Sequence, residues 1–477
     1  MKNNTRYTYY IAAAIAFILV NYLLSRFSLR LDFSKNQAHT LSDSTKQIVR
    51  NLKDPVTITF YSSSALPSRL QPAKREVTDL LNDYKSEGKN NVTILIKDPK
   101  KDQKAKQEAT DFGIPELNFS QQEQDQFAVT TGYFGVGLTG KDKKASIPQV
   151  ANIGDLEYNL SSAIYKISTA SLPTVGIMGN DSPDQQFLTL RQAGAPQFTI
   201  QDVATPTASL KTLIVIDDHE KQYTDQETAT IEQYIKSGGK AIFMTDGVWV
   251  SGNLESSEAT HGLFALLKKF GITLNKNLVM STAAEIVNFG TGGDGSQVLT
   301  AYPYWVRTQT FDRSNTYFSN VRQLTFPWTS SLSFSAPTGV QLTTLVRTVP
   351  TSWEQTSDFT LNPGEIKQPV QKSLKQFTLI ASAKLASGGQ IMVIPSSRFV
   401  EDQFLSQSSS NLDFMLNVMS DYAAGGALSG IRQRSVDLYP IPPDISNQQK
   451  DIFKYLTILL LPLAFAAYGV FHLIKRK

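Results

Sequence analysis

The sequence predicts an α/β protein whose two α/β domains lie between one membrane-spanning helix at each end. Three observations predict this arrangement. Short runs of β-branched and aliphatic residues alternate with segments of helical periodicity over most of the chain. A long apolar run lies close to each terminus. A chain of 477 residues with 41% hydrophobic residues also has material for more than one packed core.

The composition excludes several classes of site. The chain has no cysteine, which rules out disulfides, thiolate metal sites and cysteine nucleophiles. Its four histidines leave little room for a multi-histidine metal centre. The net charge of +4 is small for this length and the basic residues are scattered, so nothing indicates nucleic-acid binding. We expect no cofactor.

Two apolar segments predict the membrane topology. Residues 7–24 and 455–474 are each long enough to span a bilayer core of roughly 30 Å. The first could instead be a signal peptide, but its apolar stretch is long and no small-residue cleavage site follows it. The basic tail at 475–477 predicts that both termini are cytoplasmic and that the chain lies in the cytoplasmic (inner) membrane. Residues 27–450 are then expected outside the cytoplasm.

The first extracytoplasmic domain is predicted at residues 27–170, after a cytoplasmic N-terminus and span at 1–26. An amphipathic segment at 40–52 precedes the order strand, helix, strand, helix, hairpin, helix. The corresponding ranges are 56–62, 69–88, 92–99, 103–113, 132–150 and 153–168. This order resembles a thioredoxin-like fold, although "SSSALPS" stands where thioredoxins carry a redox cysteine pair. An extended loop is expected at 116–127.

The second domain is predicted at residues 171–430 as a mainly parallel sheet with helices on both faces. The predicted strands are 174–179, 198–203, 212–217, 240–245, 377–385 and 388–400, and the helix 411–425 closes the sheet. Residues 285–375 are rich in Ser, Thr, Pro and aromatic residues and predict an irregular or β-rich insertion. We expect a tether to the membrane at 431–454, followed by the second span and its basic tail at 455–477.

The stretch from 224 to 247 has the clearest local signals. Thr224 with Glu227 three residues later predicts a capping box at the start of a helix. Gly238 and Gly239 can take the positive φ that ends a helix. A buried strand follows and stops at Asp246. One face of the helix is apolar, with Ile231, Tyr234 and Ile235.

Two glycine-rich stretches match phosphate-binding loops only in part. Residues 135–142 fit G-x-x-x-x-G-K, but Asp142 stands where a Ser or Thr would bind Mg²⁺. Alternating apolar residues on both sides predict a hairpin around Lys141 instead. Residues 290–296 lack a strand-to-helix setting and predict a surface loop.

Polar residues lie at the carboxyl ends of four of the predicted strands and form the candidate site. They are Asn180, Asp181, Asp217, Asp218, His219, Asp246, Ser396, Ser397 and Arg398. Parallel strands share a carboxyl edge, where ligands bind in open α/β sheets, so this group could coordinate a divalent cation or bind a polar ligand. Asp, Asn and Ser also make caps and turns after strands. Spacing alone does not bring the groups to one point, so we prefer the turn interpretation and predict no catalytic or metal residue.

Along nearly its whole length the chain resembles the GldG-like family, auxiliary components of ABC transport systems named for a protein linked to gliding motility. The resemblance rests on "HTLSDSTKQIVRNLKDPVTITFYSS", "KTLIVIDD", "QYIKSGGKAIFMTDG", "GGQIMVIPSSRFVEDQF" and "LLLPLAFAAYGVFHLIKRK". It implies an ABC-transporter auxiliary domain at 171–430, with a sheet similar to glutaminase and flavodoxin-like folds. The nucleophilic cysteine of class I glutaminases has no counterpart in this chain.

The resemblance implies a membrane-anchored, non-enzymatic subunit of an ABC-2-type transport system. Its expected partners are a permease, a cytoplasmic ATPase subunit and membrane lipid, and its domains would engage a translocated substrate or the envelope. One alternative is a polar-ligand or glycan-binding module that works without a transporter. The other is a metal-dependent hydrolase that uses Asp217, Asp218, His219 and Asp246.

Overall fold

The computed structural model describes residues 40–123, 126–179, 187–217, 223–260, 262–291, 297–319, 321–366, 369, 373–405, 410–426, 431, 454–455 and 459. Both expected membrane spans lie almost entirely outside these residues. Within the described part, no helix is both long and apolar enough to cross a membrane. The chain divides into two units, Met1–Arg434 and Ser435–Lys477, and the elements below belong to the first.

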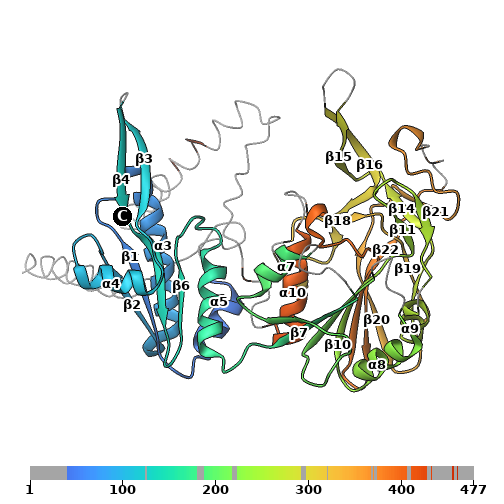
Figure 1. Ribbon diagram of the computed structural model, residues 1–477, viewed down its shortest axis with the longest axis horizontal. Helices are drawn as coiled ribbons and strands as arrows, with labels where there is room; N and C mark the ends of the chain where they lie inside the picture. Colours follow the sequence, from blue (N-terminus) through green and yellow to red (C-terminus); the bar gives the residue numbers. More distant parts are fainter. Residues whose placement is uncertain are drawn as a thin grey trace, which may run out of the picture. The chain divides into compact units, whose positions relative to one another are not determined.

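The N-terminal region is built on a four-stranded sheet in the order β2-β1-β5-β6 (Figure 1). Its strands are β1 (Val56–Ser62), β2 (Val92–Lys97), β5 (Phe134–Thr139) and β6 (Lys144–Ile147). β1 runs parallel to β2 and antiparallel to β5, and β5 runs antiparallel to β6. The β5–β6 pair confirms the hairpin around Lys141, so the partial match to a phosphate-binding loop is a turn.

Helices pack on both faces of this sheet. They are α2 (Asp43–Arg50), α3 (Gln71–Gly88), α4 (Gln103–Asp111) and α5 (Leu156–Ser168). Side chains alternate between the two faces of a strand. Ile58 and Phe60 of β1 therefore join the core made with α2, α3 and α5, whereas Tyr61 packs with Ala109 of α4.

The prediction of an extended loop at 116–127 is wrong. Strands β3 (Leu117–Glu123) and β4 (Gln126–Gly132) form an antiparallel hairpin there, drawn as a long two-stranded arm in Figure 1. The polar run at 121–126 interrupts the alternating apolar pattern that is the usual sequence signal for a strand. Backbone pairing over 117–132 defines this hairpin, and Leu117 and Phe119 pack against the core of the N-terminal region.

The second α/β region contains a ten-stranded sheet. Its parallel part has the order β8-β7-β9-β10-β23. These strands are β7 (Thr174–Met178), β8 (Thr199–Asp202), β9 (Thr212–Ile216), β10 (Lys240–Met244) and β23 (Gln390–Ile394). Helices α7 (Leu188–Gly194) and α10 (Asn411–Ala424) pack on one face, and α8 (Asp225–Lys236) and α9 (Leu263–Lys269) on the other.

The expectation of a mainly parallel sheet needs correction, because an antiparallel part extends it beyond β23. Its strands are β13 (Ile272–Leu274), β17 (Thr310–Phe311), β19 (Leu332–Phe334), β20 (Val340–Arg347) and β22 (Thr378–Leu385). Only residues 386–389 connect β22 to β23. A parallel pair needs a crossover of a dozen or more residues. A four-residue connection therefore forces β22 and β23 to pair antiparallel.

Residues between α8 and β22 also form smaller sheets. They comprise β11 (Val248–Val250), β12 (Ser256–Glu258), β14 (Leu278–Ser281), β15 (Ala284–Thr291), β16 (Gln297–Thr308), β18 (Leu324–Pro327) and β21 (Ser352–Gln355). The pairs are β11–β12, β14–β21, β15–β16 and β16–β18. An aromatic core that includes Tyr302, Tyr304, Trp328 and Trp353 holds this region together.

The local signals from 224 to 247 are confirmed. Thr224 and Glu227 form a capping box at the start of α8. Gly238 adopts a φ of +99° after the helix. The predicted apolar face of the helix is buried, and β10 follows it.

Candidate functional site

The candidate site lies at the carboxyl edge of three neighbouring parallel strands. β9, β10 and β23 end at Ile216, Met244 and Ile394. Their adjacency brings polar residues that are distant in sequence to one edge of the sheet. The described polar residues that follow these strands are Asp217, Thr245, Asp246, Ser396, Ser397 and Arg398, and all but the half-buried Arg398 are buried.

Hydrogen bonds within the protein hold both carboxylates. The Thr245 hydroxyl donates to Asp217 Oδ2 at 3.0 Å, and the backbone N–H of Asp246 lies 3.4 Å from the same oxygen. The backbone N–H of Ser397 donates to Asp246 Oδ1 at 3.0 Å. This last bond joins the end of β10 to the segment after β23. Each carboxylate is therefore part of the connection between strand ends.

The protonation of Asp246 is strongly affected by its surroundings. Burial raises the pKa of Asp246 to about 7, and the negative charge of Asp217 acts in the same direction. Hydrogen bonding from Ser397 and the positive charge of Arg398 oppose this increase. A pKa near neutrality is found at active sites and also at buried structural positions. The contacts of the neighbouring groups therefore indicate whether Asp246 has a catalytic or a structural role.

Arg398 lies in an aromatic cage that covers its guanidinium group. The distances from the guanidinium carbon to the ring centroids are 4.1 Å for Trp249, 5.0 Å for Trp328 and 5.4 Å for Phe404. Arg398 Nε also lies 4.0 Å from Glu401 Oε2. Burial lowers the pKa of Arg398, and the carboxylates of Asp246 and Glu401 raise it. Such stacking stabilises a desolvated cation.

Residues 327–331 form an edge loop that packs against the ends of β10 and β23. The Ser396 hydroxyl donates to the Pro327 carbonyl at 2.8 Å. The Pro395 carbonyl accepts from the Thr329 hydroxyl at 2.9 Å and from the following backbone N–H at 3.1 Å. The edge loop thus lies where a ligand binds in other open α/β sheets.

A close backbone approach connects the edge loop to β10. The backbone N–H of Gly247 donates to Ser330 Oγ at 3.1 Å, and the Ser330 hydroxyl donates to the Asn277 carbonyl at 2.7 Å. A Cβ atom on Gly247 would lie 2.1 Å from the Asn275 carbonyl oxygen and 2.5 Å from Ser330 Oγ. Only glycine leaves room for this packing.

Trp328 has an uncommon backbone conformation within the edge loop. Its φ is +42°, which is rare for a bulky side chain and requires support from the surrounding structure. Its backbone N–H donates to the Tyr304 carbonyl at 2.9 Å, and its indole N–H lies 3.3 Å from Tyr302 Oη. These contacts hold the indole ring beside Arg398.

The structure brings together five of the nine candidate residues, namely Asp217, Asp246, Ser396, Ser397 and Arg398. The other four, Asn180, Asp181, Asp218 and His219, lie outside the described residues. Among the residues whose placement is described, no group of three or more His, Cys, Asp or Glu side chains is arranged to hold a metal ion.

The aromatic partners of Arg398 were missed by sequence reasoning. Trp249, Trp328 and Phe404 come from three separate segments, and no periodic pattern relates them to the strand end. Glu401 was missed as well, although its position three residues after Arg398 is a local signal for an ion pair. Only the tertiary packing of residues 327–331 reveals that the strand ends are covered.

Comparisons with protein families identify the chain. The family model described as an ABC-type uncharacterized transport system matches residues 172–418, which include every strand of the ten-stranded sheet. The chain belongs to this family. Membership implies an auxiliary component of an ABC-type transport system that associates with other transporter components. A second model, for a domain of unknown function, matches residues 35–139.

Individual proteins give a more distant likeness. An uncharacterized protein of Borreliella burgdorferi is 23% identical over 491 residues, which cover 94% of this chain and 93% of that protein. The mmIFT52 N-terminal domain is 16% identical with a TM-score of 0.37, over 53% of this chain and 98% of that domain. A glutamine amidotransferase from Thermotoga maritima is 8% identical with a TM-score of 0.24, over 53% and 84% of the two chains. Likeness at these scores carries no inference about function.

Proposed function

We propose that this chain is a membrane-anchored, non-enzymatic auxiliary subunit of an ABC-2-type transport system. Its α/β domains lie outside the cytoplasm and engage the translocated substrate or the outer face of the permease. Family membership supports the link to ABC-type transport. The arrangement of the sheet edge supports the absence of catalysis.

The observation that carries the non-enzymatic role is the edge loop. In open α/β sheets, ligands and reacting groups use the crevice beyond the carboxyl ends of the strands. Here residues 327–331 lie against those ends, and they bond to Pro395 and Ser396. Asp246 bonds to a backbone N–H, and Arg398 is covered by aromatic rings. The polar residues that could bind a ligand at this edge therefore bond to the protein itself.

The anchoring part of the proposal rests on the sequence. The apolar segments 7–24 and 455–474 and the basic tail at 475–477 favour two spans with cytoplasmic ends. We place the contact with the permease in the spans and in the tether at 431–454. A reporter that is active only outside the cytoplasm is expected to work near Gly292 and to fail after Lys477.

The N-terminal domain is part of the same proposal. We infer a thioredoxin-like fold without redox chemistry, supported by the strand order β2-β1-β5-β6 and by the absence of cysteine from the chain. Such a domain acts by contact. We place the contact with a partner outside the membrane on the hairpin β3–β4.

Co-purification tests the proposal most directly. The full chain, tagged and extracted from its native membrane, is expected to retain a multi-span permease and an ATPase, identified by mass spectrometry. Replacing residues 455–474 with an unrelated span of equal length is expected to lose both partners while the chain stays in the membrane. Asp246→Asn serves as the matched control and is expected to retain them.

Two results would contradict the proposal. One is a chain that co-purifies with neither transporter component under conditions in which it stays folded. The other is an increase in melting temperature with Mg²⁺ or Zn²⁺ that Asp217→Ala abolishes. A metal site would stabilise the folded state by about 2.7 kcal/mol at one hundred times its dissociation constant, and would indicate the hydrolase alternative.

A further inference from the structure

A polar groove lies where the antiparallel part of the large sheet separates from the β14–β21 ribbon. Residues 275–277 connect β13 of the sheet directly to β14 of the ribbon. A bridge between Ser352 and Lys375 joins the two on the other side. The groove has a volume of about 580 Å³, within the range of about 300–1,000 Å³ found for small-molecule sites.

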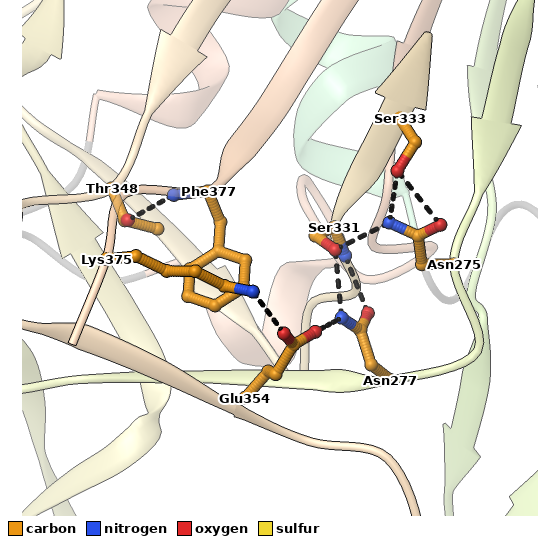
Figure 2. A network of polar contacts seen from close by, with 8 residues as sticks. All are labelled: Asn275, Asn277, Ser331, Ser333, Thr348, Glu354, Lys375 and Phe377. Carbon is orange, nitrogen blue, oxygen red and sulfur yellow. Dashed lines mark hydrogen bonds and ion pairs between the residues drawn. The ribbon is translucent and has the colours of Figure 1, made fainter. Parts of the chain in front are cut away.

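The floor of the groove is a continuous row of hydrogen bonds (Figure 2). Asn277 Nδ2 donates to Ser331 Oγ at 2.9 Å and to Glu354 Oε2 at 2.5 Å. Asn275 Nδ2 donates to the same Ser331 oxygen at 2.9 Å and to Ser333 Oγ at 2.9 Å. Asn277 and Ser331 are buried, so the centre of the row is held rigidly.

Several groups that line the groove keep hydrogen-bonding capacity. Ser331 Oγ accepts from both amides, which leaves its own proton to donate, and no acceptor for it lies among the described residues. Lys375 Nζ donates to Glu354 Oε1 at 2.6 Å and has two further protons. The side chains of Ser333 and Thr356 are exposed at the rim. The groove therefore offers donors and acceptors side by side.

The charges in the groove are paired. Lys375 neutralises Glu354, and Lys276 lies 3.1 Å from Glu258 just outside the groove. An anionic ligand such as a nucleotide would meet no unpaired cation among the described lining residues. The site thus favours a neutral ligand.

Apolar recognition contributes little in this groove. Its apolar lining residues, Leu332 and Phe377, are each 6% exposed. The ammonium group of Lys375 lies 4.9 Å from the centroid of the Phe377 ring and covers it. A ligand is therefore recognised through hydrogen bonds, with no pocket for an apolar side chain.

We propose that this groove binds a neutral saccharide. A sugar presents hydroxyl groups that donate and accept at short spacing, which matches the alternating amides, hydroxyls and carboxylate of the row. A peptide fits less well, because peptide grooves combine main-chain pairing with pockets for alternate side chains. This inference goes beyond the proposed function and does not depend on a transporter partner.

Saturation-transfer difference NMR on the full chain tests the proposal. The protein is purified in a detergent without a sugar headgroup, so that the detergent does not compete. The probes are cellobiose and N,N′-diacetylchitobiose, with glucuronic acid and triglycine as charged and peptide comparisons. Saturable binding of at least one disaccharide at millimolar concentration is expected, stronger than binding of either comparison compound.

Variants assign the binding to the groove. Asn275→Ala and Lys375→Met each remove one ligand contact and are expected to weaken disaccharide binding about fivefold. The matched controls are Asn159→Ala and Lys384→Met, which change exposed side chains outside the groove and are expected to bind like the unchanged protein. Thr356→Ala provides a third groove variant at an exposed position should Asn275→Ala lower the melting temperature.

Three outcomes would overturn the proposal. They are the absence of saturable binding by both disaccharides, binding that the groove variants leave unchanged, and stronger binding of triglycine than of either sugar. None of these outcomes bears on co-purification with a permease and an ATPase. Failure of the saccharide site is thus distinguishable from failure of the transport role.

Discussion

Two polar regions at the large sheet, the carboxyl edge and the groove, have similar residues but differ in how far these residues are covered. At the carboxyl edge of β9, β10 and β23, Asp246 and its neighbours are buried beneath the edge loop. At the groove beside β13 and β22, Lys375 and Ser333 are exposed. Both regions combine carboxylate side chains, hydroxyl or amide side chains, and basic side chains. What differs is the element that covers them.

This contrast shows why residue type at a strand end does not identify a binding site. A carboxylate beneath a packed loop stabilises the fold through its bonds to backbone N–H groups, whereas a carboxylate at an open groove keeps lone pairs for a ligand. The two roles make opposite predictions about stability. Substitutions at the carboxyl edge should destabilise the fold, and substitutions of the exposed groove residues should leave it nearly unchanged.

The largest effect is expected for Arg398→Ala. The substitution removes a cation from three aromatic rings and leaves Asp246 and Glu401 without their positive partner. Breaking one partner of a buried charge group costs about 3–5 kcal/mol. Urea denaturation followed by circular dichroism measures it, with exposed Arg347→Ala as the control. A loss no larger than that of the control would mean that the cage is not structural.

Gly247→Ala is expected to cost about 1–3 kcal/mol, as overpacking of a core does. The added methyl group would meet the Asn275 carbonyl oxygen at 2.1 Å, and this carbonyl is backbone and cannot rotate away. Gly252→Ala is the matched control, because a Cβ there has no neighbour within 4 Å. Equal melting temperatures for the two variants would contradict the close packing between β10 and the edge loop.

Asp246 should make stability fall as pH rises. Its folded pKa of about 7 is above the ordinary value of 3.8, so the folded state binds a proton that the unfolded state has released between these values. The resulting stability is complete below pH 4 and is lost as pH rises through 7.

Asp246→Asn should reduce this dependence, changing the difference in unfolding free energy between pH 5 and pH 8 by about 1–3 kcal/mol. The asparagine oxygen can still accept from the Ser397 N–H. Asp217, Arg398 and Glu401 remain the charged groups near this position. Denaturation curves at the two pH values measure the effect, and an unchanged slope in the variant would contradict it.

The smallest effect is expected for Lys375→Met in the groove. In its ion pair with Glu354 the lysine side chain is 59% exposed and the glutamate side chain 28%, and pairs at the surface contribute about 0.2–1 kcal/mol. The melting temperature should therefore stay close to that of the unchanged protein. A decrease comparable to that of Arg398→Ala would show that the groove network is structural, which would remove the contrast between the two regions.

Sequence patterns determined much of the local structure. The capping box at Thr224, the positive φ at Gly238 and the hairpin around Lys141 each depend on neighbouring residues, and all three are present. The polar residues after β9, β10 and β23 were also recognisable, because the residues next to a strand's end determine where the strand ends. The hairpin at 117–132 escaped recognition, since a polar run at 121–126 separates the apolar residues of its two strands.

Tertiary structure alone decided how the strand ends are used. The direction of β22, the position of residues 327–331 and the cage around Arg398 all depend on segments that are distant in the sequence. Short-range propensity describes each residue with its neighbours along the chain. Burial, pKa and access to a ligand depend on which distant segment packs on top, and that packing is decided by the folding of the whole domain.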